Sequence, residues 1–404
     1  MRCTRPFFSI RFHFLLCCSC IFFVTAQAAE LDSPNENGLY ATVTGYLGVE
    51  SQKPRGMTKL ELRVPTFKKP VPVRAIIQNG KAPLTVVLLG LFGNATGRFE
   101  RLWPGWLSAE GNHVLTLDST FLPYFSAVSR HGVAGNVAAE AERLSEVISA
   151  FLKHPNIEGR VSEIGIVGIS YGAIEALQLG RMAAEGRLPF RLTAIQAYSP
   201  PLRLDKSAEL LDEWHREDRW KYTLPELQAR VGGLKPGDKV SDSELRAALA
   251  AEMRLSLAAV VIANDNLFRL NALPRGNEFD DSFVREEHAQ AWTFSKYMHD
   301  IAYAYWSERK GYGSFDEFAA EMDVYRLLQK QPAYSVTFLT ADDPLNRPED
   351  FARIQNNAGK LPVVLMPRGG HLGYVNAPWL KERLCALFDA PANQPIPVST
   401  PETK

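Results

Sequence analysis

Apolar residues gather in short continuous runs at intervals along the chain. The first, Leu84-Thr85-Val86-Val87-Leu88-Leu89, ends at Gly90 and is typical of a strand buried on both faces of a sheet. Helical periodicity runs from Val137 to Phe151, after the candidate N-cap Asn136. Strand, helix and strand in succession predict a parallel sheet with helical crossovers. Further strand-like runs occur at 114–117, 164–167, 192–197, 336–339 and 363–366.

Two segments depart from this alternation. Near the start, apolar residues alternate at Leu60, Leu62 and Val64, and a related run covers 71–77. Alternation with period two predicts antiparallel strands at an edge of the sheet. From about Pro201 to Pro332 the chain is rich in Glu, Arg, Ala and Leu without a long β-branched run, which predicts helices.

Helix starts within this second segment are marked by Ser241 with Glu244 and by Ser314 with Glu317, which match capping boxes. We expect the aromatic side chains of the segment to form mainly its core, and lining of a substrate pocket is the alternative. These aromatic residues are Trp214, Trp220, Trp292, Tyr297, Tyr303, Tyr305 and Trp306.

The first 28 residues have the composition of a secretory signal. Three arginines precede an apolar stretch from Phe12 to Val24, and Ala26-Gln27-Ala28 supplies small residues for cleavage. The stretch is shorter than the roughly 20 apolar residues that cross a bilayer. Lipid attachment at Cys20 is disfavoured by the preceding Cys17-Cys18-Ser19. We therefore expect residues 1–28 to be removed and the mature protein to be periplasmic or secreted.

Charge and cysteine content narrow the function classes. The 45 Lys and Arg balance 45 Asp and Glu in the full chain, and loss of three arginines leaves 42 against 45, or −3. This balance does not favour a nucleic-acid partner. Of five cysteines only Cys385 lies beyond the signal, so no internal disulfide is expected. With 46% hydrophobic and 22% charged residues, the chain is globular rather than disordered.

The candidate chemistry centres on Gly168-Ile169-Ser170-Tyr171-Gly172. This G-x-S-x-G motif follows the buried run 164–167 and precedes a helical stretch that begins Ala173-Ile174-Glu175. A sharp turn between strand and helix needs glycines beside the serine and exposes its hydroxyl above the sheet. Because the turn lies at a helix N-terminus, its N–H groups favour an oxyanion.

A serine nucleophile requires an imidazole base and a carboxylate that orients the imidazole. The run that ends at Leu339 leads into Thr340-Ala341-Asp342-Asp343-Pro344, and the run 363–366 leads into Pro367-Arg368-Gly369-Gly370-His371. Serine, aspartate and histidine therefore follow one another in the chain, each just past a predicted strand. His371 alone among the histidines combines a preceding strand, paired glycines and this order.

This arrangement resembles the α/β-hydrolase superfamily of serine hydrolases, from about Leu39 to Leu387. The resemblance implies Ser170 as nucleophile, His371 as base and Asp343 as acid, with Asp342 as the alternative acid. It also implies an oxyanion hole formed by the N–H groups of Tyr171 and Leu91, although many members have His-Gly where this chain has Leu89-Gly90.

The resemblance implies an α/β fold with a mostly parallel sheet, antiparallel N-terminal strands and a helical cap between the sixth and seventh strands. We expect core segments at 39–200 and 333–390, a cap at 201–332 and a loose tail at 391–404. The expected activity is hydrolysis of a carboxylic ester, and the cap aromatics favour an apolar acyl substrate. Peptidase or acyltransferase action by the same triad, or an inactive binding protein of this fold, are the alternatives.

Cofactors and metals are not needed for this chemistry. The glycines from Gly90 to Gly97 lack the spacing and the lysine of a phosphate loop, and no histidine pair has H-E-x-x-H spacing. We therefore expect a small-molecule substrate, no bound cofactor or metal, no nucleic-acid partner and no stable membrane span after cleavage.

Overall fold

The computed structural model describes residues 37–45, 54–97, 99–122, 125, 128–129, 133–218, 240–270 and 292–388. The expected signal at 1–28 and the expected tail at 391–404 lie outside the described residues, as does Trp220.

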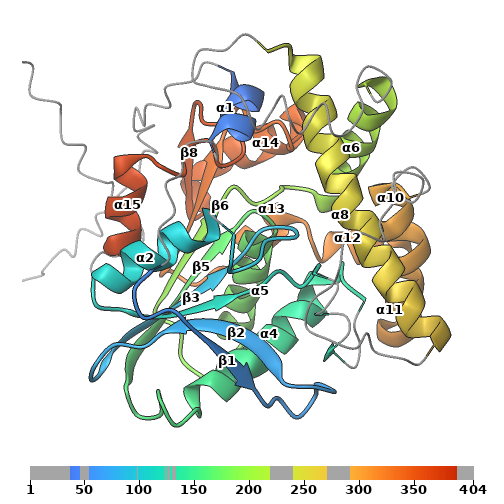
Figure 1. The fold of residues 1–404 in the computed structure, drawn as a ribbon. Helices are drawn as coiled ribbons and strands as arrows, with labels where there is room; N and C mark the ends of the chain where they lie inside the picture. Colours follow the sequence, from blue (N-terminus) through green and yellow to red (C-terminus); the bar gives the residue numbers. More distant parts are fainter. Residues whose placement is uncertain are drawn as a thin grey trace, which may run out of the picture.

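Eight strands form one sheet at the centre of the molecule, in the order β1-β2-β4-β3-β5-β6-β7-β8 (Figure 1). β1 pairs antiparallel with β2, β2 pairs antiparallel with β4, and the remaining neighbours are parallel. This topology confirms the predicted mostly parallel sheet with antiparallel N-terminal strands. The strands are β1 (Thr58–Leu62), β2 (Val71–Ile76), β3 (Ala82–Leu88), β4 (His113–Leu117), β5 (Val161–Ile169), β6 (Ala194–Tyr198), β7 (Ser335–Thr340) and β8 (Val363–Met366).

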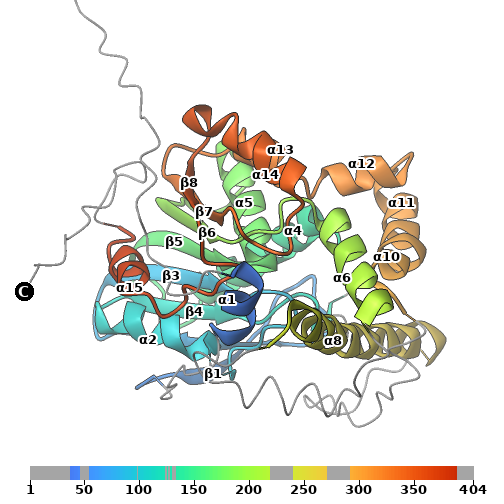
Figure 2. The same ribbon diagram turned by 90° about the horizontal axis from the view of Figure 1, so that it is seen from above.

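Helices cover both faces of the sheet (Figure 2). On one face α2 (Leu102–Ala109) and α15 (Pro378–Cys385) bury Trp103, Leu107 and Leu384 against strand residues such as Val87. On the other face lie α4 (Val137–Leu152) and α5 (Tyr171–Ala184), whose apolar side chains pack with the opposite side of β3 and β5. The predicted N-cap of α4 is confirmed, because Asn136 Oδ1 accepts a hydrogen bond from Ala139 N at 2.9 Å.

Shorter helices surround this framework. α1 (Gly38–Thr44) precedes the sheet, and η1 (Phe99–Arg101) leads into α2. α14 (Pro348–Gln355) and η4 (Ala358–Lys360) connect β7 to β8. None of the described helices is both long enough and apolar enough to cross a bilayer.

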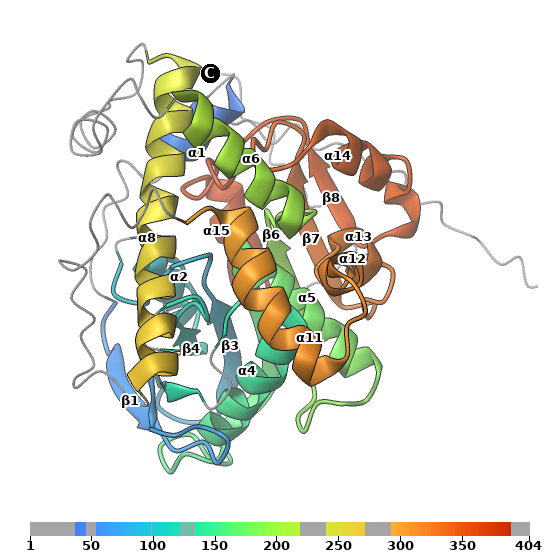
Figure 3. The same cartoon turned by 90° about the vertical axis from the view of Figure 1, so that its right-hand side faces the viewer.

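The interval between β6 and β7 is helical in its described parts, as predicted. Its longest helices, α6 and α8, lie side by side, and α10 packs against α6 (Figure 3). Both predicted capping boxes open helices: Ser241 pairs with Glu244 before α8, and Ser314 Oγ accepts from Glu317 N before α12. The elements are α6 (Leu204–Asp218), α8 (Asp242–Leu270), α10 (Phe294–Lys296), the π-helix η3 (Tyr297–Tyr303), α11 (Ala304–Lys310), α12 (Phe315–Ala320) and α13 (Val324–Leu328). The boundaries of a separate cap at 201–332 remain a prediction.

Buried hydrogen bonds attach this helical interval to the sheet framework. Tyr297 Oη donates to the carbonyl of Ala134 at 2.9 Å, and Trp306 Nε1 donates to the carbonyl of Val133 at 3.0 Å. Both aromatic side chains are buried, as expected for core residues.

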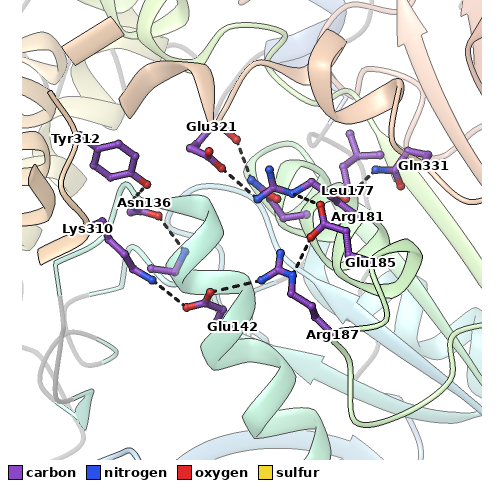
Figure 4. A network of polar contacts seen from close by, with 12 residues as sticks. Asn136, Glu142, Leu177, Arg181, Glu185, Arg187, Lys310, Tyr312, Glu321 and Gln331 are labelled. Carbon is purple, nitrogen blue, oxygen red and sulfur yellow. Dashed lines mark hydrogen bonds and ion pairs between the residues drawn. The ribbon is translucent and has the colours of Figure 1, made fainter. Parts of the chain in front are cut away.

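A second set of contacts lies nearer the surface (Figure 4). Lys310 pairs with Glu142 of α4, and Arg181 of α5 pairs with Glu321, which follows α12. Each of these partners is partly exposed, so the set adds little to stability beyond the buried bonds.

Cys385 is the free cysteine among the described residues, at the end of α15. Burial and the neighbouring Glu110 raise the pKa of its thiol to about 11. The thiol is therefore protonated near neutral pH and is a weak nucleophile.

Candidate active site

The turn at Ser170 joins the end of β5 to the first residue of α5. Ser170 has φ +53° and ψ −117°, a backbone conformation that is costly for a residue with a side chain. Both flanking glycines are sterically required: a Cβ on Gly168 would lie 2.3 Å from the carbonyl oxygen of Gly172, and one on Gly172 would lie 2.4 Å from that of Leu88. The helix begins at Tyr171, two residues earlier than expected from the pattern.

His371 lies beside this serine, brought there by the loop after β8. Its Nε2 is 2.8 Å from Ser170 Oγ, although the two residues are 201 positions apart in the chain. Gly369 and Gly370 precede it with φ +137° and +57°, conformations in which glycine avoids the strain of a side chain. Ser170 is 9% exposed and His371 is 6% exposed, so the pair is largely shielded from water.

The structure separates the two adjacent aspartates that the sequence left as alternatives. Asp343 Oδ2 is 2.9 Å from His371 Nδ1, and its Oδ1 accepts a hydrogen bond from Leu345 N at 2.9 Å. Asp342 points to the loop before the histidine, where its oxygens accept from Gly369 N at 3.1 Å and Gly370 N at 2.8 Å. Asp343 is thus the carboxylate that contacts the imidazole, and Asp342 holds the backbone that carries it.

The loop after β3 passes directly beside the nucleophile turn. A Cβ on Gly90 would lie 3.2 Å from Ser170 Cβ and 3.7 Å from Ser170 Oγ. The loop turns back through a hydrogen bond from Gly93 N to Gly90 O of 2.9 Å. Leu91 lies in this turn, and Tyr171 opens α5, so both residues predicted to supply oxyanion donors border Ser170. Their role as donors remains a prediction.

Sequence reasoning missed the part that α1 plays in this site. Thr42 Oγ1 accepts a hydrogen bond from His371 N at 2.8 Å and donates to Gly38 O at 2.7 Å. A Cβ on Gly370 would lie 2.0 Å from that same Gly38 carbonyl oxygen, which shows how closely α1 packs on the histidine loop. Asn37 could have been recognised as the N-cap of α1, but nothing in the local pattern links Thr42 to a residue 329 positions away.

Aromatic side chains from the sheet loops and the helical interval meet near the serine. Phe121 contacts Tyr171 edge-on with ring centroids 5.0 Å apart, and it contacts Phe92 at 5.9 Å. Phe92 also lies 6.4 Å from Phe294 of α10. Phe92 follows Leu91 directly and has φ +59°. Aromatic side chains therefore border the nucleophile turn on the side of Phe92 and Phe121.

Metal ligation is not indicated at this site. Within the part of the chain that the structure describes, no three His, Cys, Asp or Glu side chains are grouped so that they could hold an ion.

Comparison with known proteins finds similar structures but no match at the level of sequence. No protein-family model matches the chain, and no curated protein matches it. A bacterial membrane phospholipase A is similar at 16% identity and a TM-score of 0.45, over 88% of this chain and 92% of the other. A carboxyl esterase from Bacillus coagulans has 12% identity and a TM-score of 0.45, over 83% and 99%. An esterase from Pyrococcus furiosus has 14% identity and a TM-score of 0.43, over 83% and 89%.

The strand order, the crossovers and the serine turn after β5 define the α/β-hydrolase fold, which confirms the predicted fold class. Because one fold hosts many activities, the activity of this chain has to be argued from its own site.

Proposed function

We propose that this chain is a serine hydrolase that cleaves carboxylic esters through an acyl-enzyme on Ser170. The observation that carries the proposal is the continuous hydrogen-bonded series from Ser170 Oγ to His371 Nε2 at 2.8 Å and from His371 Nδ1 to Asp343 Oδ2 at 2.9 Å. A base within hydrogen-bond reach of the hydroxyl, itself oriented by a third group, is the arrangement that activates a serine.

In the proposed reaction Ser170 Oγ attacks the acyl carbonyl carbon while His371 Nε2 takes the hydroxyl proton. Asp343 accepts a hydrogen bond from Nδ1–H and stabilises the imidazolium that forms. The N–H groups of Tyr171 and Leu91 donate to the oxyanion. The imidazolium then protonates the leaving alcohol, and a water that gives its proton to the same imidazole hydrolyses the acyl-enzyme.

The aromatic surroundings favour an apolar acyl group. Phe92 of the oxyanion loop contacts Phe294 of α10. An acyl chain that extends from Ser170 on this side therefore meets aromatic carbon rather than charge.

The test is hydrolysis of a panel of aryl and alkyl esters by the purified protein, with covalent labelling by a fluorophosphonate. Ser170→Ala should lower kcat by on the order of 10⁶ and abolish labelling, because the nucleophile is lost. Aminoacyl amides and alcohol acceptors in the same panel identify a peptidase or an acyltransferase. Labelling that survives in Ser170→Ala would refute the assignment.

Ser199→Ala is the matched control for this experiment. Ser199 follows β6, also has a positive φ of +44°, and contacts Tyr374 Oη at 2.8 Å through its hydroxyl. Because that hydroxyl contacts Tyr374 and not His371, the variant should keep its covalent labelling at Ser170.

We also propose that the protein acts outside the cytoplasm. Support comes from the basic and apolar segment before Ala28 and from the lone cysteine beyond it. Mass analysis of the protein recovered after export should give an N-terminus at Ala29, and an intact N-terminus would contradict the proposal.

A further inference from the structure

Two carboxyl groups are buried beneath the nucleophile turn, outside the reaction proposed above. Glu140 of α4 is 0% exposed and Glu175 of α5 is 2% exposed. The buried hydroxyl of Thr120 lies between them, 2.7 Å from Glu140 Oε2 and 2.8 Å from Glu175 Oε1. The Thr120 hydroxyl therefore bridges the two carboxyl groups. Three separate segments of the chain thus meet in one closed polar cluster.

Two ionised carboxylates and one threonine hydroxyl contain too few hydrogens for these contacts, so the cluster needs one further proton. A threonine hydroxyl has one hydrogen and can donate it to only one of the two carboxyl oxygens. The second oxygen forms a hydrogen bond with the hydroxyl only if its own carboxyl group carries a proton and donates it to Thr120 Oγ1. Burial of two like charges side by side is also unfavourable. One proton is therefore held between Glu140 and Glu175.

The remaining contacts show which carboxyl group keeps the charge. Glu140 Oε1 accepts from Gly135 N at 2.6 Å and from Asn136 N at 3.1 Å, and Glu140 Oε2 accepts from Tyr171 Oη at 2.7 Å. Glu140 also lies in the first turn of α4, where the helix dipole favours an anion. Glu175 has no such set of backbone donors among its described contacts, and burial together with the charge of Glu140 raises its pKa well above the ordinary value.

Tyr171 links this cluster to the catalytic turn. It is the residue after the nucleophile, and its own N–H is the predicted oxyanion donor. Its side chain is 1% exposed, and burial and the adjacent Glu140 raise the pKa of its phenol well above the ordinary value, so the phenol keeps its hydrogen and donates it. Because backbone and side chain belong to one residue, the bond to Glu140 fixes the first turn of α5 against α4.

We propose that Glu140 and Glu175 form a proton-sharing pair in which anionic Glu140 holds Tyr171 in place, so that Glu140 is a positioning residue for the oxyanion donor beside Ser170. Glu175 carries the shared proton, so the pair has a single negative charge, which lies on Glu140. The inference rests on the proposed acyl transfer at Ser170 and adds to it a pair of residues that act through Tyr171.

Two isosteric variants make a matched test of this assignment. Glu175→Gln replaces a protonated carboxyl group by a neutral amide that can still donate to Thr120 Oγ1. Glu140→Gln removes the negative charge of the carboxylate. That carboxylate accepts hydrogen bonds from Tyr171 Oη and from two backbone N–H groups. We expect Glu140→Gln to lower kcat by on the order of 10- to 100-fold with KM within about threefold, since a displaced oxyanion donor affects the transition state more than binding. The loss in Glu175→Gln should be at least about tenfold smaller.

The rate of fluorophosphonate labelling of Ser170 should fall in parallel with kcat, because that reaction uses the same oxyanion donors. Tyr171→Phe keeps the backbone N–H but removes the hydroxyl, so it should lower kcat in the same direction, and it carries the kinetic test if Glu140→Gln does not fold. Equal losses in the two glutamine variants, or an unchanged kcat in both Glu140→Gln and Tyr171→Phe, would overturn the proposal.

A second measurement does not depend on activity. Wild-type Glu175 keeps its proton in the folded state but loses it in the unfolded state above about pH 4.5, so folding takes up a proton and stability falls as pH rises from about 5. Glu175→Gln has no such proton, so its Tm relative to wild type should increase with pH. Glu140 and Arg143 on α4, Tyr171 on α5 and Tyr297 on η3 are the titratable neighbours of the cluster, and all four are common to both proteins.

A Tm difference that is constant between pH 5 and pH 8 would refute the shared proton. If wild-type protein neither hydrolyses esters nor reacts at Ser170, the proposed function fails while the thermal comparison still decides whether the pair shares a proton. The two failures are therefore distinguishable.

Discussion

The contact between Asp343 and His371 Nδ1 fixes which imidazole nitrogen faces the serine. With Nδ1–H donating to the carboxylate, Nε2 is left to accept the hydroxyl proton of Ser170. Asp343→Asn would favour the other tautomer, because an amide nitrogen can donate to Nδ1. We expect kcat for ester hydrolysis to fall by on the order of 10⁴ with the fold intact. Steady-state kinetics with circular dichroism of the variant provide the measurement.

Asp342→Asn is the control for this prediction because it changes the neighbouring carboxylate. Asp342 accepts from two backbone N–H groups of the histidine loop, so its loss weakens the loop without altering the tautomer of His371. We expect a smaller loss of kcat, on the order of tenfold, together with a destabilisation of about 1–3 kcal/mol. A larger kcat loss in Asp342→Asn than in Asp343→Asn would show that the roles of the two residues are exchanged.

The sequence predicted side chains that the structure brings together. It did not predict which way a side chain points or whether it is buried. Ser170 and His371 carry local signatures, namely the flanking glycines and a preceding strand. Asp342 and Asp343 are adjacent, and only the course of the turn after β7 decides which of them points to the imidazole. Glu140 and Glu175 read as ordinary polar positions on helices, because their burial depends on how α4 and α5 pack.

At the scale of elements, α1 acts as a support for the histidine loop. Thr42→Val would keep the shape of the side chain but leave His371 N without its acceptor. We expect a loss of about 1–3 kcal/mol in unfolding free energy and a fall of kcat by on the order of tenfold, since the imidazole loses a fixed position. Denaturant titration and ester kinetics measure the two effects.

Thr42→Ser tests whether the hydroxyl is responsible. Serine restores both the acceptor for His371 N and the donor to Gly38 O, so its kcat should return to within about threefold of wild type. Thr42→Ser behaving like Thr42→Val would assign the effect to packing of the methyl group.

Elements differ in how much of them could be predicted. The central strands were predicted because burial on both faces leaves continuous apolar runs, and α4 because its apolar stripe is long. The predictions did not include α1, which has seven residues, nor α2, α14 and α15, which have eight each. Helices of this length are not stable alone and depend on tertiary packing that local periodicity does not report.

On the scale of the whole molecule, the helical interval between β6 and β7 is held to the sheet framework by two kinds of contact. Tyr297 and Trp306 donate buried hydrogen bonds to the backbone just before α4, which is also the backbone that Glu140 holds. Arg181 and Lys310 contribute partly exposed ion pairs. Sequence alone predicted the helices of this interval but not its docking, because Ala134 and Tyr297 are 163 positions apart.

These two kinds of contact should differ in energy. Tyr297→Phe removes a donor from a buried carbonyl, and we expect the unfolding free energy to fall by about 1–2 kcal/mol. Glu321→Gln breaks the ion pair between Glu321, which is 34% exposed, and Arg181, which is 14% exposed. We expect the unfolding free energy to change by about 0–1 kcal/mol, and by less at high salt. Urea titrations of both variants at low and high salt make the comparison. A larger stability loss in Glu321→Gln would mean that surface charge, rather than buried hydrogen bonding, holds the helices over the site.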